Sequence, residues 1–248
     1  STVRTQIFFG KDAEFACRRV CCCNPNSYFM LAASQRQKLD ESNDTLFYEH
    51  PRFVTHVDER FIEQLTELYQ QRLTPNSCVL DLMSSWISHL PSDMQFERVE
   101  GHGMNAEELA KNPRLDQYFV QNLNENQTLP FEERTFDAVL NTVSVQYLQH
   151  PEDVFAEIYR VLKPGGIAIV SFSNRMFYQK AIAAWRDGSD ASHIALVKRY
   201  FNSVRGFSQP EVIANQGPAV NPLLQMMGIA SSDPFYAVIS ERMEVLVK

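Results

Sequence analysis

Asp81 stands near the end of a short apolar run over residues 78–82 (CVLDL), and two serines, Ser84 and Ser85, follow it. Loop-forming residues precede the run, and a buried run between turn signals is typical of a central parallel strand. Ligands of open α/β sheets bind beyond the carboxyl ends of such strands. We therefore expect Asp81 to face a ligand. An ordinary buried strand with a polar turn is the alternative.

Strands and helices are expected to alternate around this run, which indicates a parallel sheet. Apolar residues at helical spacing predict helices over 55–73 and 151–162, the first opened by Thr55. Pro151 suits the first helical position of the second. Strands are predicted over 78–82, 96–101, 118–123, 136–140, 167–172 and 235–240. Shorter helices are predicted over 28–38, 86–90, 106–111, 191–201 and 209–215, with a loop over 46–53 and no clear sixth strand.

Three motifs resemble class I S-adenosylmethionine-dependent methyltransferases: VLD at 79–81, LPF at 129–131 followed by FDAV at 136–139, and RVLKPGG at 160–166. Within that class the chain resembles the methyltransferase type 11 group, in a branch that carries DLMSSW. The resemblance covers roughly residues 55–240. It implies an α/β fold with a Rossmann-like, doubly wound, mostly parallel seven-stranded sheet in residues 55–248. Residues 1–54 are expected to form a helical and loop extension, either a lid or an arm pinned onto the domain by aromatic residues.

The first motif departs from the family pattern, in which a glycine-rich turn follows the strand. Met83, Ser84, Ser85 and Ile87 fill the glycine positions. Glycine lets a backbone approach a ligand closely and adopt unusual dihedral angles. The turn is therefore expected to meet the cofactor with serine side chains. Trp86 is expected either to cover the cofactor or to block its pocket, with packing at the edge of the sheet as the alternative.

The second departure concerns the cofactor's ribose. The family places an acidic residue at the end of the second strand, and this chain has Gly103 there. His102 and Asn105 are the expected substitutes. Asn122 stands where the family contacts the adenine, and an amide can pair with an adenine edge. The resemblance implies that S-adenosyl-L-methionine, leaving as S-adenosyl-L-homocysteine, contacts Asp81, Met83, Ser84, Ser85, Trp86, Gly101, His102, Asn105, Asn122, Leu123, Asn141 and Thr142.

The implied reaction moves a methyl group to a small-molecule acceptor. A base is needed only when the acceptor carries a proton at attack; the candidates are His50, His56, His89 and Tyr147, each of which a structural role also explains. No prolines follow Asn141, which argues against the chemistry of enzymes that methylate amino groups of DNA and protein. The alternative is a binding or regulatory protein that keeps the fold with weak or lost cofactor binding.

Composition excludes several classes. The net charge of -7 and pI near 5.4 argue against nucleic acid or an anionic membrane as partner. No apolar stretch approaches the length of a membrane span. Dinucleotide, P-loop and nucleophile-elbow glycine motifs are absent.

The five cysteines are Cys17, Cys21, Cys22, Cys23 and Cys78. Their odd number favours a reduced, intracellular and cytoplasmic setting, or an organelle such as a plastid if a leader has been removed. Cys17 and Cys21 to Cys23 lack the spaced second pair of a zinc site, so no metal is expected.

Overall fold

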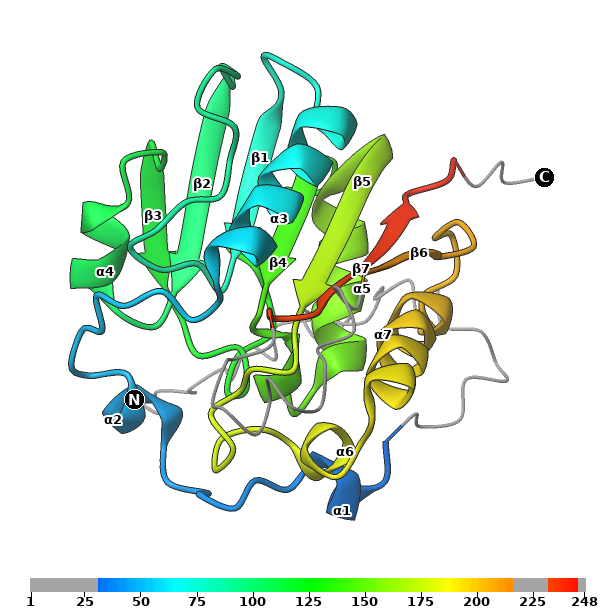
Figure 1. Cartoon of the computed structure of the whole chain (residues 1–248). Coiled ribbons are helices and arrows are strands. Elements are labelled where there is room, and N and C mark those ends of the chain that lie inside the picture. The colour runs from blue at the N-terminus through cyan, green and yellow to red at the C-terminus, as the bar shows by residue number, and fades with distance from the viewer. Residues whose placement is uncertain (1–30, 216–231, 245–248) are drawn as a thin grey trace, which may run out of the picture.

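The computed structural model describes residues 31–215 and 232–244. Its strands are β1 (Cys78–Leu82), β2 (Arg98–Gly103), β3 (Gln117–Val120), β4 (Phe136–Thr142), β5 (Leu162–Phe172), β6 (Glu211–Asn215) and β7 (Phe235–Glu241). They form one seven-stranded sheet in the order β3-β2-β1-β4-β5-β7-β6 (Figure 1). Neighbours from β3 to β5 are parallel, whereas β7 is antiparallel to β5 and β6. The predicted doubly wound, mostly parallel sheet is thereby confirmed.

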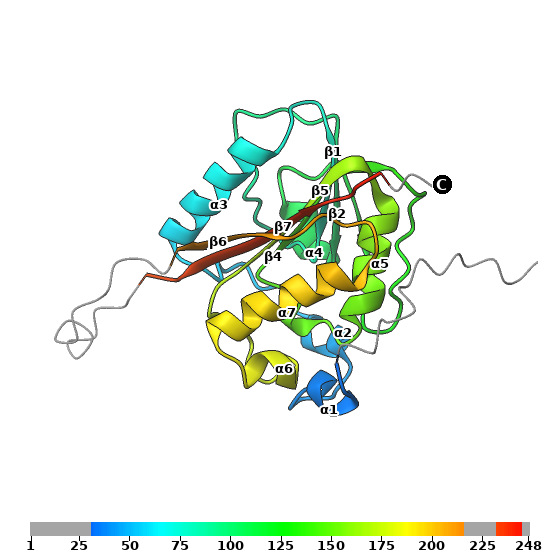
Figure 2. The same cartoon turned by 90° about the vertical axis from the view of Figure 1, so that its right-hand side faces the viewer.

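Helices cover both faces of the sheet (Figure 2). Helix α3 (Glu59–Arg72) packs on one face, and α5 (Pro151–Val161) and α7 (Asp190–Ser203) pack on the other. Each buries an apolar stripe; in α3 this stripe includes Phe61, Leu65 and Leu68. The shorter helices are α1 (Ala33–Arg36), α2 (Asp44–Phe47), α4 (Ala106–Lys111) and α6 (Ala183–Arg186), with a 3-10 turn η1 (Val145–Tyr147).

The first long helix begins later than predicted. Asp58 caps α3, because its Oδ1 accepts a hydrogen bond from the backbone N–H of Phe61 at 2.9 Å. The predicted cap, Thr55, lies outside the helix. Part of the predicted loop over 46–53 belongs to α2.

Two other helix predictions were wrong. Residues 86–90 form no helix; the chain from Ser84 to β2 is irregular, and Ser88 Oγ accepts the N–H of Leu90 at 3.2 Å. Serines in such positions compete with the helix for backbone hydrogen bonds, and Pro91 follows. Residues 211–215 form β6, the strand that the sequence left unplaced, because β-branched Val212 and Ile213 fit beside β7.

Residues 31–58, the N-terminal segment, run along the edge of the sheet where the parallel strands end (Figure 1). Lys180 fastens this segment to the chain after β5. Its Nζ lies 3.0 Å from Asp40 Oδ2 and 3.3 Å from Asp44 Oδ1, and donates to the carbonyl oxygen of Ser42 at 2.8 Å. The Lys180 side chain is only 1% exposed, so its charge depends on these partners. Whether the segment opens as a lid stays a prediction.

We predict that Lys180→Met lowers the free energy of unfolding by about 2 kcal/mol, because it removes one of the two cations beside the buried Asp44 carboxylate and the Lys180 donor to the Ser42 carbonyl. Lys163→Met is the matched control, since Lys163 pairs with Asp137 at 2.7 Å but is 39% exposed. Its loss should cost less than about 1 kcal/mol. Urea unfolding at pH 7 measures both; equal losses would contradict the anchoring role of Lys180.

Candidate functional site

A cavity of about 410 Å³ opens at the carboxyl ends of the parallel strands. Its floor comes from the turns that follow β1, β2, β3 and β4, and its roof from residues 44–57 of the N-terminal segment together with Arg175, Met176 and Phe177 after β5. The volume lies within the range usual for small-molecule sites. Among the described residues, a ligand-sized cavity therefore lies at the edge of the sheet where open α/β sheets bind their ligands.

Most residues singled out from the sequence line this cavity. Nine of the twelve expected cofactor contacts do so: Asp81, Met83, Ser84, Ser85, His102, Asn105, Asn122, Leu123 and Thr142. Three of the four candidate bases do so as well: His56, His89 and Tyr147.

Four expected site residues lie elsewhere. Trp86 donates from its indole N–H to the carbonyl of Val54 at 3.3 Å and does not line the cavity, so it neither covers nor blocks it. Gly101 lies inside β2, where an added Cβ would meet Leu115 at 2.3 Å. Asn141 is buried and donates to the carbonyl of Leu82 at 3.3 Å. His50 is exposed on the N-terminal segment.

His102 holds the turn after β1 in place. Its Nδ1 accepts the N–H of Met83 at 3.0 Å, so its Nε2 carries the proton that is donated to the carbonyl of Gln121 at 2.9 Å. The Ser84 N–H also donates to the His102 carbonyl at 2.6 Å. Burial lowers the pKa of His102 to about 4, which keeps the ring neutral. Both ring nitrogens are used, so the expected role of His102 at a ribose does not fit this geometry.

Both polar atoms of the Asn105 side chain also have protein partners. Its Oδ1 caps α4 by accepting the N–H groups of Glu107 and Glu108 at 2.9 and 3.1 Å. Its Nδ2 donates to the carbonyls of Tyr48 and Glu49 at 2.9 and 3.1 Å. The side chain thus joins α4 to the N-terminal segment and has no atom left for the expected ribose contact.

The turn after β1 is strained where the family has a glycine. Met83 has φ of +59°, in the left-handed region that favours glycine. Val143, after β4, has φ of +49° and also lines the cavity. A β-branched residue in this region is unusual, and such strain is concentrated at functional sites.

Asp81 is the most perturbed carboxyl group of the cavity. Burial raises its pKa to about 6, and a hydrogen bond from Ser84 Oγ at 2.6 Å opposes the rise. One carboxylate oxygen is therefore held by Ser84, and Asp81 still lines the open space. An underpaired carboxylate of this kind suits a cationic or hydroxyl-bearing ligand.

The candidate bases differ in their surroundings. Burial raises the pKa of Tyr147 to about 12, so this phenol is protonated at neutral pH; its oxygen accepts the N–H of Phe177 at 2.8 Å. Burial lowers the pKa of His89 to about 4. Desolvation and the nearby charge of Arg52 lower the pKa of His56. The His56 ring packs edge-on against Phe177. Both histidines are neutral at pH 7 and can accept a proton.

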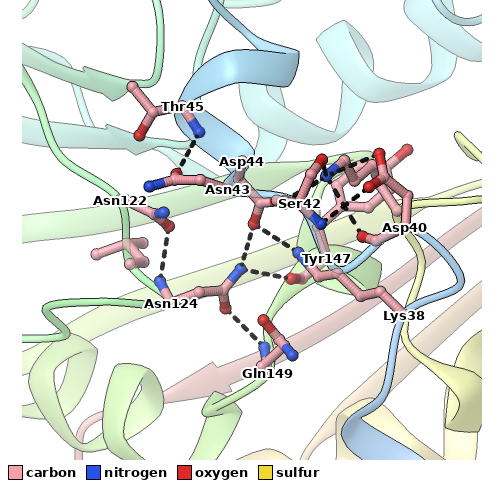
Figure 3. A network of polar contacts seen from close by, with 12 residues as sticks. Lys38, Asp40, Ser42, Asn43, Asp44, Thr45, Asn122, Asn124, Tyr147 and Gln149 are labelled. Carbon is pink, nitrogen blue, oxygen red and sulfur yellow. Dashed lines mark hydrogen bonds and ion pairs between the residues drawn. The ribbon is translucent and has the colours of Figure 1, made fainter.

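A polar network that the sequence patterns did not predict lies beside the cavity (Figure 3). Asn124 Nδ2 donates to Asp44 Oδ2 at 2.9 Å and to the carbonyl of Tyr147 at 3.0 Å, while its Oδ1 accepts the N–H of Gln149 at 2.7 Å. Asp44 also pairs with Lys38 at 2.6 Å. The network ties the N-terminal segment to the exits of β3 and β4. Glu108, on α4, is a further cavity residue that the sequence analysis missed.

Within residues 31–215 and 232–244, no group of three metal-ligating side chains comes together. Cys78 is a free, buried thiol, and Cys17 and Cys21 to Cys23 lie outside the described residues. None of the helices in these ranges is both long and apolar enough for a membrane span.

Sequence comparison matches residues 92–170 to the model of the Methyltransferase domain family, type 11. A malonyl-[acyl-carrier protein] O-methyltransferase from Marinomonas sp. is 32% identical over 66 residues, which are 27% of this chain and 24% of that protein. Squalene methyltransferase 1 from Botryococcus braunii is 34% identical over 76 residues, which are 31% of this chain and 18% of that protein. The matched segments span less than a quarter of these relatives.

Structural comparison covers more of the chain. A complex of the Haloferax volcanii Trm112 methyltransferase activator with a methyltransferase contains a chain that superposes with a TM-score of 0.54 at 14% identity, over 77% of this chain and 93% of that one. The [4+2]-cyclase SpnF superposes with a TM-score of 0.52 at 17% identity, over 82% and 91%. At these identities the likeness shows the fold.

The domain match, the three sequence motifs and the seven-stranded fold agree with one another. Residues 92–170 thus match a type 11 methyltransferase domain, and the sheet of the described residues has the class I methyltransferase fold.

Proposed function

We propose that this chain binds S-adenosylmethionine in the cavity and transfers its methyl group to a small-molecule acceptor. The observation that carries the proposal is the convergence of nine expected cofactor contacts on one ligand-sized space at the carboxyl edge of the sheet. The fold alone would not suffice, because a cyclase shares it. When bound, the cofactor supplies a methyl group on a positively charged sulfonium, which is already activated.

The residues in the cavity fit the cofactor's polar groups. Asp81, with Ser84 and Ser85, would receive the amino-acid end. Asn122 would face the adenine with its amide N–H₂, which makes no hydrogen bond to the described residues, while its Oδ1 accepts the N–H of Asn124 at 3.0 Å. The DLMSSW turn, held by His102, would thus take the place of the family's glycine turn.

The remaining work of the protein is to align the acceptor and exclude water. Tyr147, which follows β4, stacks on Phe177 of the roof with ring centroids 6.0 Å apart, and both rings line the cavity. Holding both partners in line can be worth ~7–11 kcal/mol of the barrier. For an acceptor that carries a proton, we favour His56 as the base, because it is neutral at pH 7 and less deeply buried than His89. The Tyr147 phenol is protonated at pH 7, so it can supply a proton to the acceptor but cannot remove one.

The acceptor that we propose is a small or carrier-bound organic molecule. The relatives named above act on a malonyl-acyl-carrier protein and on squalene, which have little chemistry in common. Their names support a small or carrier-bound organic acceptor rather than nucleic acid.

Met83 at a glycine position and Gly103 at the acidic position favour one competing function, a binding protein of the same fold without the cofactor.

Melting curves with S-adenosylmethionine and S-adenosylhomocysteine separate the two functions, with calorimetry to measure affinity. A ligand at a hundred times its Kd adds about 2.7 kcal/mol to stability and raises the Tm. Adenosine triphosphate at equal concentration is the control for unspecific nucleotide binding. A higher Tm with both sulfur compounds is expected. No shift and no heat of binding would favour the competing function.

We predict that Asp81→Asn stabilises the ligand-free protein at pH 7. The pKa of Asp81 is raised in the fold, so its contribution to stability is full below the unfolded value near 4 and is lost as pH rises through about 6. The asparagine variant cannot ionise at this position, so it keeps the free energy of unfolding that the wild type loses, which is on the order of 2–3 kcal/mol. Urea unfolding at pH 4 and pH 7 measures it; equal stabilities of variant and wild type at pH 7 would contradict it.

The same variant should bind the cofactor product more weakly. In the wild type, affinity for S-adenosylhomocysteine is expected to fall by up to ~10-fold per pH unit below about 6, as Asp81 becomes protonated. In Asp81→Asn affinity should be lower at pH 7 and nearly independent of pH from 5 to 7. Calorimetry across this range checks the prediction. A variant that binds like the wild type would remove Asp81 from the site.

A further inference from the structure

The end of β2 cannot carry the acidic residue that the family uses for the ribose. A Cβ added to Gly103 would lie 2.7 Å from the carbonyl oxygen of Ser84 and 3.1 Å from Leu109. The first of these neighbours is backbone, and the Ser84 N–H bond to the His102 carbonyl fixes it. The serine turn after β1 and the glycine after β2 are therefore coupled: the turn occupies the space that a side chain at position 103 would need.

The polar side chains next to Gly103 in the sequence cannot replace the missing acidic side chain. Both nitrogens of His102 and both polar side-chain atoms of Asn105 already have protein partners. A ribose bound near the end of β2 would need another acceptor for its two hydroxyl groups.

Glu108 is such an acceptor. It stands on α4, five residues after Gly103, and lines the same cavity as Gly103 and Met104. Its Oε1 accepts the backbone N–H of Arg52 at 2.7 Å. Its Oε2 makes no hydrogen bond to the described residues, and it is not among their buried unpaired atoms, so it is accessible. Partial burial raises the pKa of Glu108, as expected for a carboxylate with too few partners.

We propose that the Glu108 carboxylate accepts hydrogen bonds from the ribose hydroxyls of the cofactor, in place of a side chain at position 103. The inference rests on the proposed function. A carboxylate accepts only, a vicinal diol offers two donors, and such charge-assisted bonds are among the stronger ones. The same group would then hold the N-terminal segment through Arg52 and the cofactor through its ribose.

The test uses 5′-methylthioadenosine, which has the adenine and ribose but lacks the amino-acid end that Asp81 would bind. Its 2′-deoxy analogue lacks one hydroxyl. Calorimetry compares both probes in the wild type, in Glu108→Gln and in the control Glu107→Gln, whose side chain is exposed and does not line the cavity. Glutamine keeps an oxygen for the Arg52 N–H, and melting curves verify that each variant folds.

The wild type and Glu107→Gln should bind the ribose probe at least ~10-fold more tightly than the deoxy probe. In Glu108→Gln this preference should fall to within about threefold, mainly through weaker binding of the ribose probe. An undiminished preference in Glu108→Gln would overturn the inference while leaving the proposed function intact. A wild type that binds neither probe nor S-adenosylhomocysteine would overturn the proposed function, and the inference with it.

Discussion

The cavity depends on one buried imidazole. His102 accepts a hydrogen bond from the turn after β1 and donates one to the chain after β3, while its own backbone belongs to β2. Three strand ends are thus held together by a ring that must stay neutral. Phe119 packs against this ring with centroids 5.0 Å apart. The fixed turn carries Ser84 to Asp81 and excludes a side chain at Gly103, so the polar character of the floor follows from this interaction.

The roof depends on a second set of contacts, between parts of the chain that are far apart in sequence. Asp44 reaches Asn124 after β3 and Lys180 after β5, and Asn105 holds the carbonyls of Tyr48 and Glu49. These contacts bury polar groups that would be costly without partners. They hold the N-terminal segment across the strand ends. Floor and roof meet at Glu108, which accepts the N–H of Arg52.

Most of the sheet could be predicted from the sequence, because strands and long helices leave local patterns such as the apolar run at 78–82 or the Pro151 helix start. The helix prediction over 86–90 was wrong because a serine side chain takes a backbone N–H of this segment and Pro91 cannot continue a helix. Residues 211–215 became a strand because β7 lies beside them, which no local pattern reveals. His102 and Asn105 line the cavity, but the partners that occupy their side chains come from the turn after β1 and from the N-terminal segment, which no local pattern reveals. Asp44 was missed because its partner Asn124 is 80 positions away.

A crystal structure of the chain with S-adenosylhomocysteine tests the central claim, that the serine turn and its surroundings form the cofactor site. The account predicts that the amino-acid end lies within contact distance of Asp81, Ser84 and Ser85, with the ribose hydroxyls at the Glu108 carboxylate and the adenine beside Asn122. The His102 bonds to Met83 and Gln121 should persist. A cofactor bound with its amino-acid end elsewhere, or a turn that releases His102 to admit it, would contradict the account.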